Sequence, residues 1–169
     1  MQQALAKSKN DIIVSYDPIS SHAATHFEDT LNLKELVIEV IANLDLNGEE
    51  ISAHFDMGRV VGSCDVVTVD GSDEIVYGVR KNRDDDGLVP FTKTRHGTPC
   101  PYVAVHLVPE PDKTYMLSSA WIGKFGDDDE PFPQSPNANE RSAGFWSKHA
   151  FVYGSQEIVP GTETAIKPW

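Results

Sequence analysis

The stretch YVAVHLVPEPDKTYMLSSAWI, residues 102–122, decides the fold. Two runs that are rich in apolar, β-branched and aromatic residues, 102–108 and 115–122, have the composition of β-strands. They are joined by PEPDK at 109–113, which contains two prolines and an aspartate and favours a turn. We therefore predict that these runs form the central antiparallel pair of a sheet.

Further strands are predicted on both sides of this pair. Residues 51–55 alternate between apolar and polar side chains, which is the pattern of a strand buried on one face. Asp70-Gly71 is a strong hairpin signal between two such stretches. The other predicted strands cover 64–69, 74–79, 88–92 and 150–153.

One helix is predicted ahead of these strands, at 30–44. Its apolar residues recur at intervals of three and four, which is the spacing of one helix face: Leu33, Leu36, Val37, Val40, Ile41 and Leu44. Asn32 is expected to cap the helix, with Glu35 three residues on as in a capping box. Asn47-Gly48 is a turn signal that ends the segment.

The predicted fold class is α+β. It consists of a twisted antiparallel sheet with the N-terminal helix and a short C-terminal helix, at 140–148, packed on it. Residues 1–29 are mostly polar and weakly periodic, so we predict a loosely structured N-terminal arm that adds at most one short element. A single α+β domain is predicted over 30–169.

The composition is that of a globular protein with a strong excess of negative charge. The chain has 169 residues, enough to bury a core without disulfides or metals. Its 26 acidic and 14 basic residues give a net charge of −12. This charge opposes non-specific binding to nucleic acid or anionic membranes, but it permits a local basic site.

The cysteines and the apolar segments indicate the compartment. Cys64 and Cys100 are the only cysteines and form no CxxC pair, which is typical of free thiols in a reducing compartment. The polar start of the chain lacks the apolar region of a signal peptide, and no apolar run approaches the length of a membrane span. We expect a cytoplasmic protein that does not enter the membrane and needs no cofactor.

A basic cluster is the first candidate site. Four consecutive residues next to a predicted strand carry three basic groups and a hydroxyl, and a further arginine precedes them: Lys93, Thr94, Arg95, His96 and Arg80. Such a group is suited to bind a phosphate, which arginine holds with two hydrogen bonds. The alternative is that these cations neutralise the acidic run at 84–86.

Two strand residues are the next candidates. Ser118-Ser119 places hydroxyls in an otherwise apolar strand, where Ser119 is suited to bind a phosphate oxygen or to form a hydrogen bond within the sheet. His54 lies opposite the apolar face of its strand, and its imidazole is suited to proton transfer. Alternatively, His54 is an ordinary surface histidine without a catalytic role. His106 has apolar neighbours and is predicted to be structural.

The remaining candidates lie near the two ends of the chain. Trp146 and His149 share the predicted C-terminal helix, where Trp146 either packs onto the sheet or stacks on a nucleobase. His22 and His26 are four residues apart and would share a face on a helix, but their segment has no helical pattern. It also lacks the glutamate that zinc proteases carry after the first histidine. We therefore predict no metal site.

Two quoted segments carry a family resemblance. Residues 91–123, FTKTRHGTPCPYVAVHLV and YMLSSAWIG with the turn between them, together with FWSKHA at 145–150, resemble a group of small uncharacterised bacterial proteins. The first segment is similar, more distantly, to the Barnase/EndoU/colicin/RelE superfamily of metal-independent ribonucleases. The resemblance implies a helical N-terminal part before an antiparallel sheet. It also implies a site lined by a histidine, a lysine or arginine, and a late strand hydroxyl, here Ser119.

The resemblance implies RNA cleavage by acid–base chemistry. His54 would take the proton from a 2′-hydroxyl, whose oxygen would attack the adjacent phosphate. Arg95 and Lys93 would stabilise the charge on the phosphoryl oxygens, and Ser119 would hold one of them. His149 or His96 would protonate the leaving oxygen. The expected substrate is RNA, because the reaction needs a 2′-hydroxyl.

Two other functions are compatible with the sequence. A non-enzymatic acidic protein of the antitoxin or immunity type would use its negative surface to block a basic protein partner. A small-molecule binding domain would have a closed apolar pocket between sheet and helix, lined by Trp121, Trp146 and Tyr115. The mutual positions of these residues distinguish the three functions.

Overall fold

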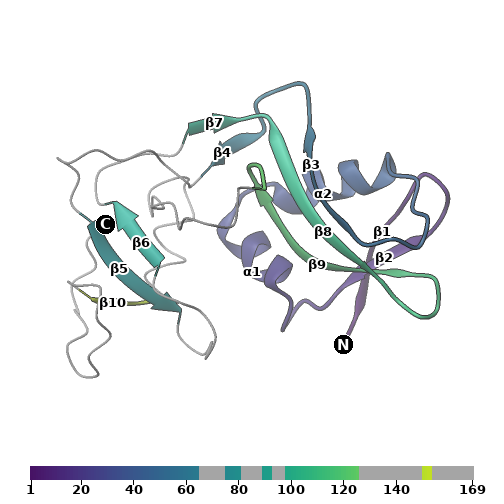
Figure 1. Cartoon of the computed structure of the whole chain (residues 1–169), viewed down its shortest axis with the longest axis horizontal. Helices are drawn as coiled ribbons and strands as arrows, with labels where there is room; N and C mark the ends of the chain where they lie inside the picture. Colours follow the sequence, from purple (N-terminus) through teal and green to yellow (C-terminus); the bar gives the residue numbers. More distant parts are fainter. Residues whose placement is uncertain (65–74, 81–88, 93–97, 126–149, 154–169) are drawn as a thin grey trace. The chain divides into compact units, whose positions relative to one another are not determined.

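The computed structural model describes residues 1–64, 75–80, 89–92, 98–125 and 150–153 (Figure 1). The chain divides into two compact units, each of which is described by itself. The first consists of Met1–Gly62 and Pro99–Gly126, and the second of Ser63–Thr98 and Asp127–Trp169. A single domain over 30–169 would require the two units to associate, and it stays a prediction.

The first unit contains a five-stranded sheet in the order β1-β2-β9-β8-β3. Its strands are β1 (Gln3–Lys7), β2 (Ile13–Tyr16), β3 (Ile51–Asp56), β8 (Tyr102–Pro109) and β9 (Tyr115–Ile122). β8 and β9 form an antiparallel pair inside the sheet, which confirms the central prediction. β3 pairs antiparallel with β8, and β1 with β2.

The sheet is mixed, because β2 pairs with β9 in parallel. The prediction of a purely antiparallel sheet was therefore wrong in this detail. Parallel neighbours need a long crossover between them. Here the whole chain from Asp17 to Thr114 separates the two strands, and a turn signal cannot announce a pairing over such a distance.

The turn between β8 and β9 has the conformation of a short hairpin loop. The N–H of Glu110 donates to the carbonyl of Thr114 at 2.9 Å, and the N–H of Lys113 donates to the carbonyl of Glu110 at 3.1 Å. Lys113 has a positive φ of 66°, as the last residue of such loops does. A register shift follows in the strands, where Ser119 lies opposite His106 but Leu117 lies opposite Leu107, so Ser118 has no direct counterpart.

Two helices complete the first unit, α1 (His22–Asp29) and α2 (Leu33–Ala42). The second confirms the helix predicted at 30–44, although it is shorter at both ends. Asn32 stands at its N-cap but makes no side-chain capping bond. The expected capping box is therefore wrong, because Asn32 has the left-handed conformation, φ 61°, instead of the extended one that capping side chains adopt.

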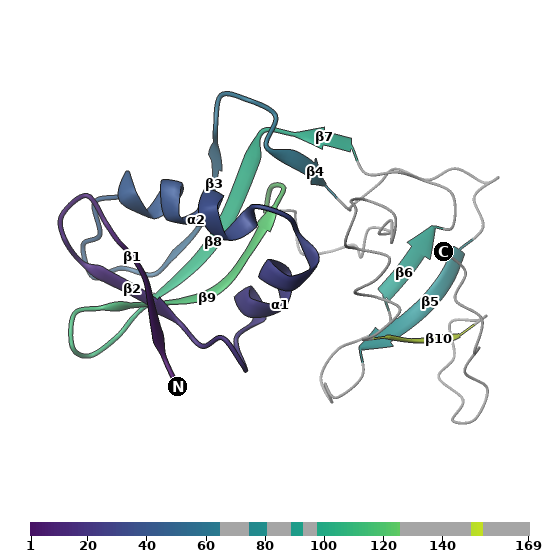
Figure 2. The same ribbon diagram turned by 180° about the vertical axis from the view of Figure 1, so that it is seen from behind.

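The hydrophobic core lies between α2 and the face of the sheet that α2 covers. α2 packs against β1, β8 and β9 (Figure 2). Its buried residues are the predicted ones, Leu33, Leu36, Val37, Val40 and Ile41. Val103, Val105 and Leu107 alternate along β8 and are fully buried, as is Leu117 on β9. This burial of apolar surface is the main stabilising term of the unit.

The N-terminal residues contain more regular structure than the single short element predicted for 1–29. They supply β1, β2 and α1, and both strands belong to the five-stranded sheet. α1 begins at a capping residue: the Ser21 hydroxyl accepts a hydrogen bond from the N–H of Ala24 at 3.1 Å. Phe27 is the one large apolar residue of this helix, so no recurring spacing of large apolar residues could reveal it.

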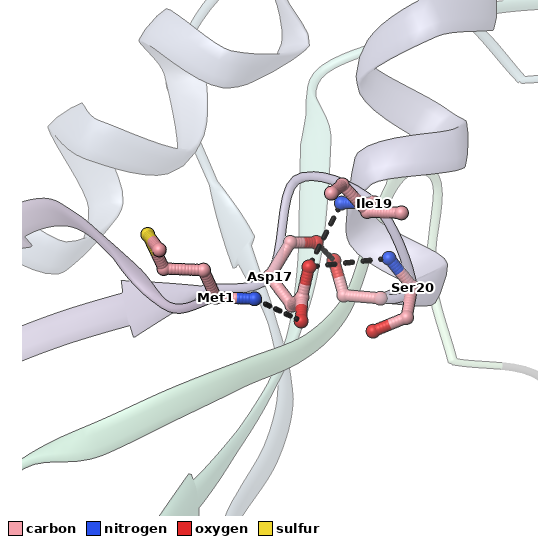
Figure 3. Close-up of polar contacts among 5 residues, drawn as sticks. Met1, Asp17, Ile19 and Ser20 are labelled. Atoms are coloured by element: carbon pink, nitrogen blue, oxygen red, sulfur yellow. Dashed lines mark hydrogen bonds and ion pairs between the residues drawn. The ribbon is translucent and has the colours of Figure 1, made fainter.

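The turn before α1 is organised by Asp17 (Figure 3). Its carboxylate accepts hydrogen bonds from the N–H of Ile19 at 2.9 Å and of Ser20 at 3.3 Å, and pairs with the Met1 amine at 3.1 Å. Its carbonyl accepts from the Ser21 hydroxyl at 2.6 Å. The Ile19 bond, followed by the Met1 amine and the Ser20 bonds, holds the pKa of Asp17 well below its ordinary value of 3.8.

We expect Asp17→Asn to lower the melting temperature near neutral pH. A carboxyl group whose pKa is depressed by folding stabilises the folded state above its unfolded pKa, and this contribution is lost as the pH falls below that value. The difference between wild type and Asp17→Asn should therefore be constant down to about pH 5 and shrink below about pH 4. Thermal melts of both proteins over this range measure it. A difference that grows towards low pH would contradict the assignment.

The second unit contains a three-stranded antiparallel sheet in the order β10-β5-β6. Its strands, β5 (Ile75–Arg80), β6 (Val89–Thr92) and β10 (Ala150–Tyr153), confirm the strands predicted at 74–79, 88–92 and 150–153. A separate two-stranded sheet is formed by β4 (Gly62–Cys64) and β7 (Thr98–Cys100). The hairpin at Asp70-Gly71 and the helix at 140–148 lie outside the described residues, as does nearly all of the strand at 64–69.

The architecture thus confirms the α+β class for the described part of the chain. Neither α1 nor α2, the helices of this part, is long and apolar enough to cross a membrane. Neither Cys64 nor Cys100 forms a disulfide, and Cys100 is buried.

Candidate functional site

One face of the five-stranded sheet carries polar and aromatic side chains instead of the apolar core. In antiparallel strands, residues directly opposite each other project from the same face. His54 lies opposite Ala104, which lies opposite Trp121. Every second residue joins them, and by this rule the face also carries the buried Ala104 and Ser119 and the half-buried Val108 and Met116. Its exposed or half-buried polar and aromatic side chains are Ser52, His54, Asp56, Tyr102, His106 and Trp121. We call these six residues the open face.

Aromatic rings gather at one end of the open face. His54 makes an edge-to-face contact with Tyr102, with ring centroids 5.6 Å apart and planes at 89°. Trp121 makes a similar contact with Phe125, at 4.5 Å and 65°. The ammonium group of Lys124 lies over the Tyr102 ring, 4.3 Å from its centroid. We call the four rings, His54, Tyr102, Trp121 and Phe125, the aromatic cluster.

The loop after β9 is fixed to this cluster by two hydrogen bonds. The N–H of Gly123 donates to the carbonyl of Tyr102 at 3.0 Å, and the indole N–H of Trp121 donates to the carbonyl of Lys124 at 3.3 Å. The position of the Lys124 backbone therefore depends on the Trp121 ring. A cation held on an aromatic face in this way is an electrostatic contact of moderate strength.

His106 lies further along the open face, towards the start of β3. Its Nε2 is 2.8 Å from a carboxylate oxygen of Glu50, and its side chain is 30% exposed. The sequence predicted a structural role for His106, because its neighbours along the chain are apolar. The structure instead places it on the open face. Alternation along β8, which puts Tyr102 and His106 on one side, is the signal that could have revealed it.

His54 and His106 are the two imidazoles of the open face among the described residues. Ala104 faces His54 directly, and His106 lies two residues further along β8, so the histidines are diagonal neighbours. Such neighbours are separated by about 7–8 Å or slightly less. Their rings contact opposite ends of the face, since one packs on Tyr102 and the other bonds to Glu50.

Ser119 lies opposite His106 and belongs to the same face of the sheet, but it is buried where α1 packs against β9. Its side chain is 8% exposed, and its hydroxyl oxygen lies 3.5 Å from Nδ1 of His22. The rings of His22 and His26 stack with centroids 4.5 Å apart. The helix that the sequence did not predict therefore does bring these two histidines together. Little of the Ser119 hydroxyl is accessible to a phosphate, and its predicted role stays a prediction.

A bound metal ion would need several ligand side chains close together. Within the described ranges, no group of three or more histidine, cysteine, aspartate or glutamate side chains is arranged to hold a metal ion.

The other predicted site residues belong to the second unit or lie outside the described residues. Arg80 is the last residue of β5, opposite Ala150 on β10. The remaining ones, Lys93, Thr94, Arg95, His96, Trp146 and His149, are not among the described residues. Their convergence with His54 stays a prediction.

The small-molecule pocket predicted from the sequence involved two residues of β9. Tyr115 is fully buried and belongs to the face of Leu117, whereas Trp121 belongs to the open face. Residues 115 and 121 would share a face in a regularly alternating strand, but the register shift at Ser118 puts them on opposite faces, so these two rings cannot line one cavity. Trp146, the third predicted residue, lies outside the described residues.

No family model, curated protein or solved structure matches this chain. The resemblance to the ribonuclease superfamily therefore stays a prediction. A functional conclusion has to be drawn from the open face and the residues around it.

Proposed function

We propose that this protein cleaves RNA without a metal ion, by acid–base chemistry at the open face. The observation that supports the proposal is an exposed imidazole, His54, held on a strand beside a second imidazole on the adjacent strand. Strands hold side chains in place better than loops do, which acid–base catalysis requires.

In this mechanism His54 acts as the base. Its neutral imidazole accepts the proton of a 2′-hydroxyl, and the resulting oxygen attacks the neighbouring phosphorus. The bond from phosphorus to the 5′-oxygen breaks, and an acid protonates that oxygen. The products are a 2′,3′-cyclic phosphate and a 5′-hydroxyl. No step requires a metal ion.

The sequence offered two candidates for the acid, His96 and His149. The structure adds His106, whose ring is oriented by the Glu50 carboxylate at 2.8 Å. A separation of about 7–8 Å between the two histidine positions leaves room for one phosphate between an acid and a base. Lys93 and Arg95 remain the proposed cations that stabilise the phosphoryl oxygens.

The decisive experiment is incubation of the pure protein with end-labelled RNA in EDTA. We expect fragments with 2′,3′-cyclic phosphate ends. A matched oligonucleotide with one ribonucleotide in a DNA strand should be cut only after that ribose, and its 2′-O-methyl analogue should stay intact. Arg95→Ala should reduce the rate.

Two outcomes would overturn the proposal. One is the absence of cleavage at high protein concentration. The other is cleavage that needs a divalent cation or leaves 3′-hydroxyl ends, since neither follows from attack by the 2′-oxygen. Either outcome would favour the non-enzymatic acidic protein with a basic partner.

A further inference from the structure

We propose that the aromatic cluster is a stacking site for an unpaired nucleobase, with Lys124 contacting the adjacent phosphate. The inference rests on the proposed function and specifies its substrate class, single-stranded RNA. It uses residues that the sequence did not assign to RNA binding, Tyr102, Trp121 and Lys124.

The first argument is the placement of the rings. Tyr102 and Trp121 are half-buried on the face that carries His54, and the His54 ring packs directly against Tyr102. A base that stacks on this cluster therefore brings its sugar and phosphate next to the proposed catalytic imidazole. Stacking on aromatic side chains is the usual way in which proteins bind unpaired bases.

The second argument is that the site is formed before a ligand arrives. The edge-to-face contacts fix the planes of the rings, and the bonds of Gly123 and of the Trp121 indole fix the loop that carries Lys124. Binding then orders few additional groups, which lowers its entropic cost.

The third argument concerns charge and selects between two classes of ligand. Lys124 already places a cation on the Tyr102 ring, 4.3 Å from its centroid. A basic side chain from a protein partner would have to displace this ammonium group. A nucleobase that stacks on the Trp121 ring would instead leave this ammonium group in place and bring its phosphate towards it, so the arrangement favours the nucleotide.

Asp56 provides a test of whether the site prefers an anionic or a cationic ligand. It lies directly opposite Tyr102 on the open face, and one of its carboxylate oxygens accepts a hydrogen bond from the N–H of Gly58 at 2.8 Å. The carboxylate opposes a phosphate and favours a cation. Asp56→Asn keeps an acceptor oxygen for Gly58 and removes the charge.

The experiment measures binding separately from cleavage. A labelled single-stranded 2′-O-methyl RNA, which cannot be cleaved by a 2′-oxygen, is titrated with wild-type protein and variants by fluorescence anisotropy. Trp121→Leu should weaken binding about 10- to 100-fold, as expected for the loss of one stacked base. Trp121→Phe should restore much of it. A duplex of the same sequence should bind more weakly than the single strand, because its bases are already stacked.

The charge variants give results of opposite sign. Lys124→Gln should weaken binding and reduce its salt dependence by the contribution of about one phosphate contact. Asp56→Asn should strengthen it. Lys7→Gln, which removes an exposed lysine on β1, is the matched control and should change little. These surface variants keep the core intact.

The outcomes separate this inference from the proposed function. Binding that depends on Trp121 without any cleavage of ordinary RNA would support the stacking site and overturn the nuclease. Cleavage with unchanged binding in Trp121→Leu would overturn the stacking site alone. A third outcome concerns an oligo-arginine peptide as ligand. The stacking site would be overturned in favour of a basic protein partner if this peptide bound more tightly to Lys124→Gln and less tightly to Asp56→Asn while neither substitution changed RNA binding.

Discussion

Replacement of Tyr115 by phenylalanine is expected to lower the free energy of unfolding by about 1–3 kcal/mol. The Tyr115 ring is fully buried on β9. Its hydroxyl accepts a hydrogen bond from the N–H of Gly48 at 2.7 Å and donates one to the carbonyl of Glu49 at 2.9 Å. It therefore ties the turn between α2 and β3 to the centre of the sheet. Phenylalanine fills the same space but leaves both backbone groups without this partner.

Urea unfolding of wild type and Tyr115→Phe measures the effect, with Tyr16→Phe as the matched control. Tyr16 is also buried, but its hydroxyl contacts the flexible Lys34 ammonium at 3.1 Å and Gln3 at 3.5 Å. Loss of these contacts should cost about 1 kcal/mol or less, because the Lys34 and Gln3 side chains can turn to water and no backbone group is left unpaired. Equal effects of the two substitutions would show that the turn does not depend on Tyr115.

The Tyr115 contacts also show which parts of the fold local sequence signals could predict. Asn47-Gly48 was identified as a turn, and Gly48 indeed has a positive φ of 92°, where glycine is preferred. The strands at 102–108 and 115–122 were found because composition and turn formers act within a few residues. The tie between the turn and β9 joins residues 66 and 67 positions apart, and no local pattern reports it.

The parallel pairing of β2 with β9 and the helix α1 were missed for related physical reasons. β2 is four residues long, and its pairing covers only Val14 and Ser15. α1 contains one large apolar residue, Phe27, so large apolar residues do not recur along it. Its N-cap, Ser21, is a signal that the sequence does contain. A cap alone does not predict a helix, because serine is also common in turns.

The residues of the candidate site also divide into those that local sequence signals could predict and those that depend on long-range pairing. His54 was singled out because its own strand alternates, which is local information. The open face arises from the register among β3, β8 and β9, which brings residues from 52 to 121 to one surface. His106 and Lys124 could be assigned only once that register was known.

Replacement of His54 by alanine is expected to have the largest effect on activity. Loss of a general base lowers kcat by about 100- to 10,000-fold. The free energy of unfolding should change little, because the His54 side chain is exposed and substitutions at exposed positions are usually small in effect. The measurement is kcat and KM on a short single-stranded RNA in EDTA, together with urea unfolding of the same preparations.

Ser52→Ala is the matched control, since Ser52 is exposed on the same face two residues away. It should leave kcat unchanged, whereas His106→Ala should lower kcat if His106 is the acid. A His54→Ala protein that is folded and cleaves at the wild-type rate would exclude His54 as the base.

The kinetic constants also separate catalysis from binding on one surface. A base acts on the reacting proton alone, so His54→Ala should change kcat with little change in KM. A stacking ring contacts the substrate before and during the reaction, so Trp121→Leu should raise KM while kcat falls less. His54 packs against Tyr102, which itself carries the Lys124 ammonium. If both functions are real, removing Tyr102 should affect both constants, because its ring orients the base and contributes to the stacking surface.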